Sequence, residues 1–119
     1  MNINITEDQS KPSRGYTYRA HHDDVEVGRA TLYILNNDLH SRPFGLLEDV
    51  YVNENLRGSG VGTQLTQHVI KKARDYGCYK LICTSRYTKP KVHQLYTRLG
   101  FKDHGKEFRI DYVHSRHLD

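Results

Sequence analysis

The chain is 119 residues long, which suits one domain with one hydrophobic core that folds without disulfides or metals. Eighteen lysines and arginines against fourteen aspartates and glutamates leave a net charge of +4. This modest excess is equally compatible with an anionic ligand, with solubility or with weak nucleic-acid contact. Charge alone therefore gives no reason to expect nucleic acid as the main partner. No apolar run reaches the roughly 18 residues of a membrane span, and the start of the chain lacks the basic and apolar regions of a signal peptide, so we expect a cytoplasmic protein without a membrane partner.

Short segments of strand-like polarity fill the first third of the chain. Residues 2–6 alternate between polar and apolar side chains, which predicts a short edge strand. Residues 16–20 and 25–35 are predicted to form two further strands joined by a hairpin turn. Residues 44–52 are more continuously apolar, as expected of a central strand that is covered on both faces.

The next segment changes to helical periodicity. Over residues 60–76 apolar side chains recur every fourth position and charged side chains take the other side, which predicts an amphipathic helix. Gly77 follows where a left-handed residue commonly ends a helix. Residues 79–84 are predicted to form a strand, and a strand, helix and strand in succession favour a right-handed crossover with parallel pairing.

A second helix and a hairpin are predicted for the last third of the chain. Thr88 is placed to cap the helix, with Pro90 in its first turn and Gly100 at its end. Residues 101–103 and 107–113 are predicted to form a final hairpin. Together these elements predict a single α/β domain over residues 1–119, with a mixed sheet and two main helices.

A glycine-rich turn joins the predicted central strand to the first helix. Three glycines on alternate positions leave the backbone open to a ligand, and the first amides of the helix point outward at the positive end of its dipole. Such a turn suits a diphosphate, but its spacing matches neither the dinucleotide fingerprint nor the P-loop. A flexible turn without a ligand is the alternative. The turn consists of Arg57, Gly58, Ser59, Gly60, Val61, Gly62 and Thr63.

Three motifs lie in a fixed order between about residues 44 and 112. They are the strand Leu47-Glu48-Asp49-Val50-Tyr51-Val52, the turn Arg57-x-x-Gly60-x-Gly62, and the helix end Leu95-Tyr96-Thr97-Arg98-Leu99-Gly100-Phe101. In this order and at these intervals they resemble the GNAT superfamily of acetyl-coenzyme A-dependent N-acetyltransferases. The resemblance implies a twisted mixed sheet with a V-shaped split between two parallel central strands, in which acetyl-coenzyme A lies as the cosubstrate.

The resemblance also implies which residues contact coenzyme A. Backbone groups of Val50, Tyr51 and Val52 are expected to hold the pantetheine arm and the acetyl carbonyl, and the glycine turn is expected to hold the pyrophosphate. Lys89 stands where many relatives carry an asparagine that contacts the pantetheine, and its ammonium, or Arg86, suits the phosphates instead. The histidines and cysteines show no supported metal-ligand spacing, so no metal site is expected.

Two side chains are candidates for the chemistry of acetyl transfer. On a regular strand Glu48 shares a face with Leu46 and Val50 and interrupts an apolar row. A carboxylate there is costly unless paired or functional, so Glu48 is predicted to take the proton of the acceptor amine, directly or through water, with a salt-bridged structural carboxylate as the alternative. Asp49 is expected to point to the opposite face in a structural role. Tyr96 is predicted to protonate the leaving thiolate, with simple core packing as the alternative.

The predicted fold has too few residues to form the helices that line the acceptor site in the family. The family inserts two helices between its first two strands, whereas about nine residues, 7–15, separate them here, too few for two helices. We therefore expect the N-terminal helices to be reduced or missing. The acceptor amine, a small molecule or a protein, then meets an open site or one completed by a second subunit, which favours a homodimer. A module that senses acetyl-coenzyme A without catalysis is the alternative function.

Overall fold

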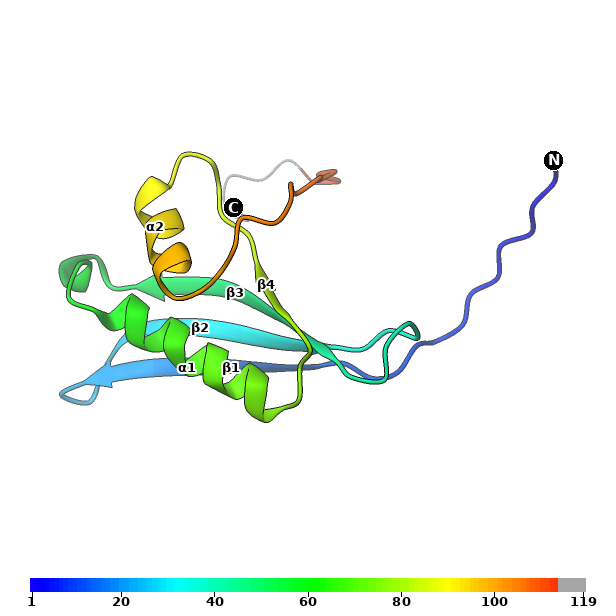
Figure 1. Ribbon diagram of the computed structural model, residues 1–119. Coiled ribbons are helices and arrows are strands. Elements are labelled where there is room, and N and C mark those ends of the chain that lie inside the picture. Colours follow the sequence, from blue (N-terminus) through cyan, green and yellow to red (C-terminus); the bar gives the residue numbers. More distant parts are fainter. Residues whose placement is uncertain (114–119) are drawn as a thin grey trace.

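The computed structural model describes residues 1–113 and contains a four-stranded sheet and two α-helices (Figure 1). The strands lie in the order β1-β2-β3-β4, with antiparallel pairing among the first three and parallel pairing of β4 with β3. The predicted mixed sheet and the two main helices are therefore confirmed. In chain order the elements are β1 (Arg14–His22), β2 (Val25–Leu35), β3 (Phe44–Val52), the 3-10 turn η1 (Glu54–Leu56), α1 (Val61–Asp75), β4 (Leu81–Cys83) and α2 (Pro90–Arg98).

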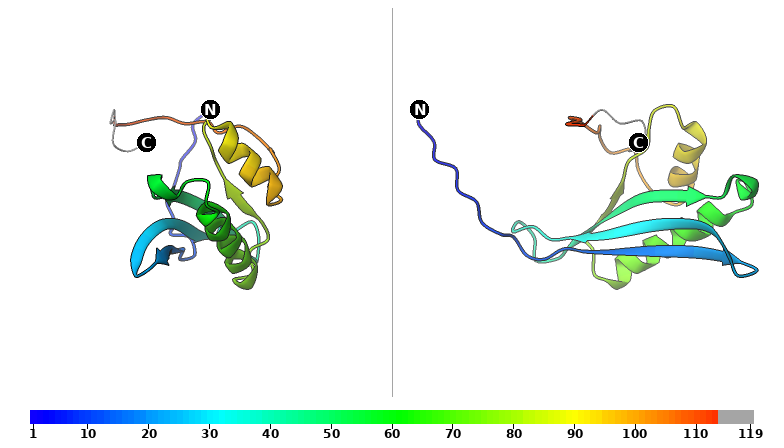
Figure 2. Two further views of the ribbon diagram at one scale, coloured as in Figure 1. Left: turned by 90° about the vertical axis from the view of Figure 1, so that its left-hand side faces the viewer. Right: turned by 180° about the vertical axis from the view of Figure 1, so that it is seen from behind.

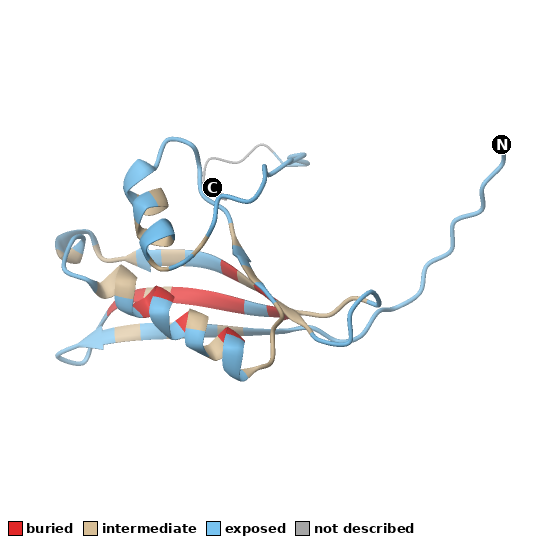
Figure 3. Cartoon of the chain, in the orientation of Figure 1, coloured by how far each residue is buried: buried red, intermediate tan, exposed pale blue. Residues whose placement is uncertain are grey.

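The helix α1 covers one face of the sheet and forms the core with it. The centre of β2 and the facing side of α1 carry most of the buried side chains (Figure 3). At Gly45 of β3 the packing is so close that an added Cβ would lie 2.9 Å from Leu81 Cδ1. No described helix lies over the opposite face of β1, β2 and β3, as the view from behind shows (Figure 2). The core residues are Ala30, Leu32, Ile34, Leu47, Leu65, Val69 and Ala73.

The tight turn between β1 and β2 confirms the first predicted hairpin. Asp23 and Asp24 have φ angles of 51° and 62°. Positive φ at both central residues of a two-residue loop gives the backbone twist that matches two antiparallel strands. Aspartate tolerates this conformation better than most residues, which explains its use here.

The two terminal strand predictions are wrong. Residues 1–13 form no strand and run away from the sheet (Figure 1), with Ile3 and Ile5 exposed. Residues 101–113 form no hairpin, and Phe108 and Ile110 are exposed. Apart from Phe101, which packs against the core, the apolar side chains of these segments are exposed, so little burial offsets the entropy lost when a backbone is ordered.

Two smaller expectations also need correction. β3 is covered on one face only, because α1 packs on the side of Gly45 and Leu47 while Glu48 and Asp49 are exposed. The N-cap of α2 is Lys89, which makes no side-chain capping bond, rather than Thr88, although Pro90 does occupy the first turn. Neither α1 nor α2 has the length and apolar character that a membrane span requires.

Candidate active site

The parallel pair β3 and β4 separates partway along the sheet. The two strands are paired only at Gly45–Leu81, Leu46–Ile82 and Leu47–Cys83, and beyond these residues they diverge (Figure 1). The Gly45 N–H donates to the Lys80 carbonyl oxygen at 2.9 Å, so odd-numbered residues in this part of β3 direct their backbone groups toward β4. Among the described strands, none pairs with the edge of β3 after Leu47. A free strand edge therefore begins directly before Glu48.

A β-bulge follows at the point where this free edge begins. Glu48 is opposite Thr31 and Tyr51 is opposite Arg29, so Asp49 and Val50 together face one residue of β2. Asp49 has a φ of 53°, which bends the strand locally. An extra residue of this kind inverts the alternation of side chains and backbone groups in the rest of the strand.

The inverted alternation decides which amides line the free edge. Val50 packs against the core and Val52 lies opposite Gly28, so both side chains now share the face of Leu47. Side chain and backbone directions alternate together in a strand, so the N–H and C=O groups of Val50 and Val52 point away from β2, toward the free edge. The next residue, Asn53, points the other way as this alternation requires, because its N–H donates to the Val27 carbonyl oxygen of β2 at 2.7 Å.

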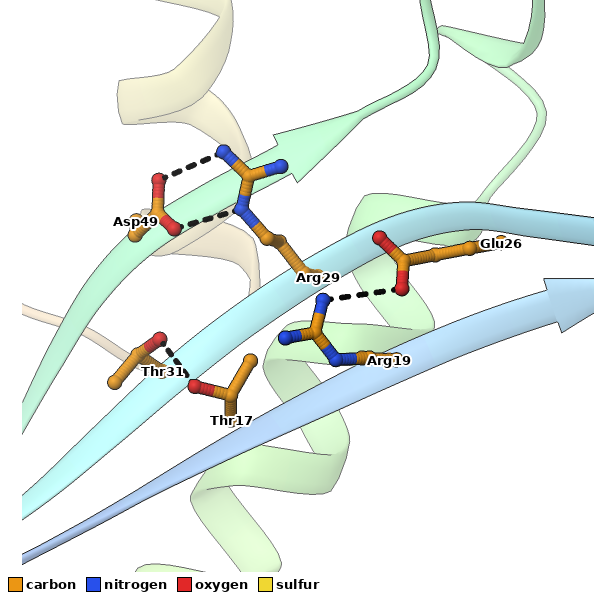
Figure 4. A network of polar contacts seen from close by, with 6 residues as sticks. All are labelled: Thr17, Arg19, Glu26, Arg29, Thr31 and Asp49. Atoms are coloured by element: carbon orange, nitrogen blue, oxygen red, sulfur yellow. Dashed lines mark hydrogen bonds and ion pairs between the residues drawn. The ribbon is translucent and has the colours of Figure 1, made fainter.

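The bulge also corrects the predicted surroundings of Glu48. Glu48 does not share a face with Val50 and Val52; it lies on the face opposite α1, exposed, and among the described residues its carboxylate has no hydrogen-bond or ion-pair partner. The predicted salt-bridge alternative therefore does not apply to Glu48. The ion pair belongs to its neighbour Asp49, which does not point to the opposite face but lies on the same side of the sheet, against Arg29 (Figure 4).

The glycine turn leaves the start of α1 open. Gly60 is the N-cap with a φ of 94° and no side chain caps the helix. The first helical hydrogen bond runs from the Gln64 N–H to the Gly60 carbonyl oxygen at 3.0 Å, so the three amides before Gln64 have no helical partner. Two hydrogen bonds stabilise the turn: the Ser59 hydroxyl donates to the Leu56 carbonyl oxygen, and Arg57 Nε donates to the Val52 carbonyl oxygen at 3.3 Å. The predicted anion site therefore has unpaired donors on an ordered turn.

Three of the predicted segments meet at the start of α1. A Cβ added at Gly62 would lie 3.5 Å from Val52 Cγ2 and 4.0 Å from Leu95 Cδ2, so this glycine faces both β3 and α2. Arg98 Nη2 donates to Thr63 Oγ1 at 3.3 Å, which places a guanidinium beside the open amides. Sequence reasoning missed Arg98, although it lies within the third motif.

Tyr96 lies on the inner side of α2 beside Phe101 and Cys83. Its ring centroid is 5.3 Å from that of Phe101. Burial, with a smaller contribution from Cys83, raises the pKa of Tyr96 to about 12, and burial raises the pKa of Cys83 to about 11. The Tyr96 phenol therefore keeps its proton at neutral pH and is available as a donor. Lys89, in contrast, is exposed, and within residues 1–113 no contact joins its side chain to the glycine turn.

The raised pKa of Tyr96 predicts a loss of stability in alkali. The folded state binds this proton more tightly than the unfolded chain, so the contribution is complete below about pH 10 and disappears as the pH rises through about 12. We expect the free energy of unfolding in urea to fall less between pH 9.5 and 11.5 in Tyr96→Phe than in the parent protein. Tyr87→Phe, at an exposed tyrosine, is the control and should fall like the parent. Equal slopes in all three proteins would contradict the assignment.

The described residues contain no group of three histidine, cysteine, aspartate or glutamate side chains arranged to hold a metal ion. Cys78 and Cys83 are free thiols. The candidate groups on and beside β3 are therefore backbone amides, one exposed carboxylate and one half-buried phenol. This set is suited to binding an anion and an extended amide-bearing chain, and to moving protons.

Comparison with known proteins identifies the class. Residues 2–101 match the family model described as "Acetyltransferase (GNAT) family". The chain therefore belongs to the GNAT acetyltransferase family. Its fold is similar to a putative acetyltransferase from Agrobacterium tumefaciens str. C58, with a TM-score of 0.77 and 31% identity over 82% of this chain and 68% of that one.

Two curated relatives carry the names of N-acetyltransferases. Glucosamine 6-phosphate N-acetyltransferase of Trypanosoma brucei brucei is 36% identical over 71% of this chain and 56% of its own length. Aminoglycoside N(6')-acetyltransferase type 1 of Stenotrophomonas maltophilia is 37% identical over 56% of this chain and 44% of its own length. The chain thus spans about half the length of the curated relatives it matches.

Proposed function

We propose that the chain is an N-acetyltransferase that binds acetyl-coenzyme A along the free edge of β3 and passes the acetyl group to a primary amine by direct attack in a ternary complex. The observation that carries the proposal is the junction of two sets of unpaired donors: the amides of Val50 and Val52 on β3, and the uncapped start of α1. The first set suits the amide groups of a pantetheine arm, and the second suits a pyrophosphate.

Each end of the cosubstrate is assigned to a part of this junction. The turn Arg57 to Thr63 holds the pyrophosphate through backbone amides, with the Arg98 guanidinium adding positive charge beside it. The pantetheine pairs with β3 as an additional strand would. A backbone amide in the range Val50 to Val52 donates to the thioester carbonyl oxygen and stabilises the oxyanion that develops on attack.

The reaction needs two proton transfers. The amine nitrogen forms a bond to the acetyl carbon and loses a proton to Glu48, directly or through water, since its exposed carboxylate is free to accept one. The carbon–sulfur bond then breaks and the Tyr96 phenol donates to the leaving sulfur. A thiol in water has a pKa near 8.5, but burial raises the pKa of the neighbouring Cys83 thiol to about 11. Burial of the leaving thiolate would raise its basicity in the same direction, which favours its protonation by Tyr96.

The acceptor is proposed to be a small amine, with amino sugars the first class to test because two curated relatives carry names of that kind. The face of the sheet that bears Glu48 has no described helix over it. A second subunit, in a homodimer, is the proposed cover for the acceptor.

The test is a calorimetric titration with acetyl-coenzyme A, followed in the same sample by thiol release with pooled amines that include glucosamine, glucosamine 6-phosphate and an aminoglycoside. Micromolar binding with amine-dependent thiol release supports the enzyme. Binding without release from any amine favours an acetyl-coenzyme A-sensing module, for which the replacement of the family's asparagine by Lys89 is the supporting observation. No binding contradicts both.

A further inference from the structure

One ion pair joins the bulge of β3 to β2 on the face of the sheet opposite α1. Arg29 Nε donates to Asp49 Oδ2 at 2.7 Å, and Arg29 Nη2 donates to Asp49 Oδ1 at 3.4 Å (Figure 4). We infer that Arg29 and Asp49 are positioning residues, which hold β3 in the phase that presents the Val50 amide to the thioester carbonyl. The inference rests on the proposed function and adds two residues to it that contact neither reacting atom.

Asp49 has a conformation that its strand alone does not favour. Three non-glycine residues in the described chain have positive φ, and the other two, Asp23 and Asp24, form a hairpin turn that requires it. Asp49 instead lies inside a strand, at a φ of 53°. A residue held in this region persists only when surrounding contacts fix it.

Arg29 supplies such contacts on both sides of the bulge. It binds the carboxylate of Asp49, the bulged residue, in a two-pronged arrangement. Its guanidinium carbon also lies 4.8 Å from the centroid of the Tyr51 ring, and Tyr51 is its partner in the strand register. One side chain of β2 therefore fixes the residues that flank Val50.

The phase of the strand determines whether Val50 can act. If the bulge relaxes by one residue, the alternation of the rest of β3 reverses, because successive residues of a strand face opposite ways. The amide of Val50 then turns toward β2 and away from the free edge. The pair also reduces electrostatic repulsion of the oxyanion. Arg29 neutralises the carboxylate of Asp49, which is one residue from the Val50 amide that would bind the oxyanion.

The test separates positioning from stability. The side chains of Arg29 and Asp49 are 36% and 54% exposed, so breaking the pair should change global stability little. We expect Arg29→Gln and Asp49→Ala to lower kcat by about 10- to 100-fold, a partial loss of one oxyanion donor, while the Kd for acetyl-free coenzyme A changes less than twofold. Asp49→Asn should retain more activity than Asp49→Ala, because asparagine tolerates positive φ and can still accept a hydrogen bond from Arg29.

The matched control is Arg19→Gln. Arg19 pairs with Glu26 at 3.0 Å on the same face, with similar exposure, beside the register shift between β1 and β2 rather than at the bulge of β3 (Figure 4). Arg19→Gln should leave kcat and the Kd for coenzyme A unchanged.

A second readout does not depend on turnover. The carbonyl stretch of acetyl-coenzyme A labelled with 13C at the acetyl carbonyl should move to lower frequency on binding the parent protein, as a hydrogen bond to the oxygen requires, and should move back toward the free value in Arg29→Gln and Asp49→Ala. Parent-like frequencies and kcat in both variants would overturn the positioning role while leaving the proposed function intact. Failure of the parent protein to bind acetyl-coenzyme A would overturn both.

Discussion

Gly60→Ala is expected to weaken binding of acetyl-coenzyme A by at least tenfold, while Gly77→Ala at the other end of the same helix leaves it unchanged. Both glycines have strongly positive φ, 94° and 81°, and an added Cβ would meet no atom within 4 Å at either position. The two substitutions therefore impose the same kind of backbone strain, about 1 kcal/mol each, without a steric clash.

Only the location of the strain differs between the two variants. Relaxation at residue 60 turns the first amides of α1 out of the common direction that a pyrophosphate needs, whereas relaxation at residue 77 affects the last turn of the helix. Calorimetric titration gives the affinities and thermal unfolding gives the stabilities. Similar losses of Tm with unequal affinities support the anion site at this turn. Equal affinities for the two variants would place the phosphates elsewhere.

Glu48→Gln is expected to lower kcat/KM for an alkyl amine by about 100-fold, the usual range for loss of a general base, while the affinity for acetyl-coenzyme A stays the same. The side chain is exposed and has no partner among the described residues, so stability should change by less than about 0.5 kcal/mol. Glu26→Gln is the control, because Glu26 is a carboxylate on the same face that pairs with Arg19.

The acceptor itself offers a further check on Glu48. An amine of low pKa is already neutral at pH 7, and its nitrogen is also more acidic once it is bonded to the acetyl carbon, so it depends less on a base. The rate difference between Glu48→Gln and the parent protein should therefore shrink with trifluoroethylamine compared with ethylamine. An equal deficit with both amines would assign Glu48 to binding rather than to proton transfer, and an unchanged rate with either would remove it from the mechanism.

Local elements were predictable wherever a segment carries its own signal. The four-residue periodicity over 60–76 predicts α1 closely, since the helix runs from Val61 to Asp75 and Gly77 follows with positive φ. The open glycine turn was equally predictable from the sequence, because unpaired amides at the start of a helix follow from helix geometry alone. The segments 2–6 and 101–113 carry a strand pattern but form no strand, since a strand requires a neighbour and the pattern does not supply one.

The phase of β3 was decided by the tertiary structure. Leu46 and Leu47 are both apolar, as are Val50 and Val52 on either side of Tyr51, so the polarity of the segment fits a regular strand and a bulged one equally well. The sequence by itself determined that a strand, a glycine turn and a helix follow one another, because periodicity and glycine conformation are local properties. Only the fold decided which amides of β3 face the free edge and that Asp49, rather than Glu48, is the paired carboxylate. Both depend on contacts with Arg29 of β2, a residue twenty positions away in the chain.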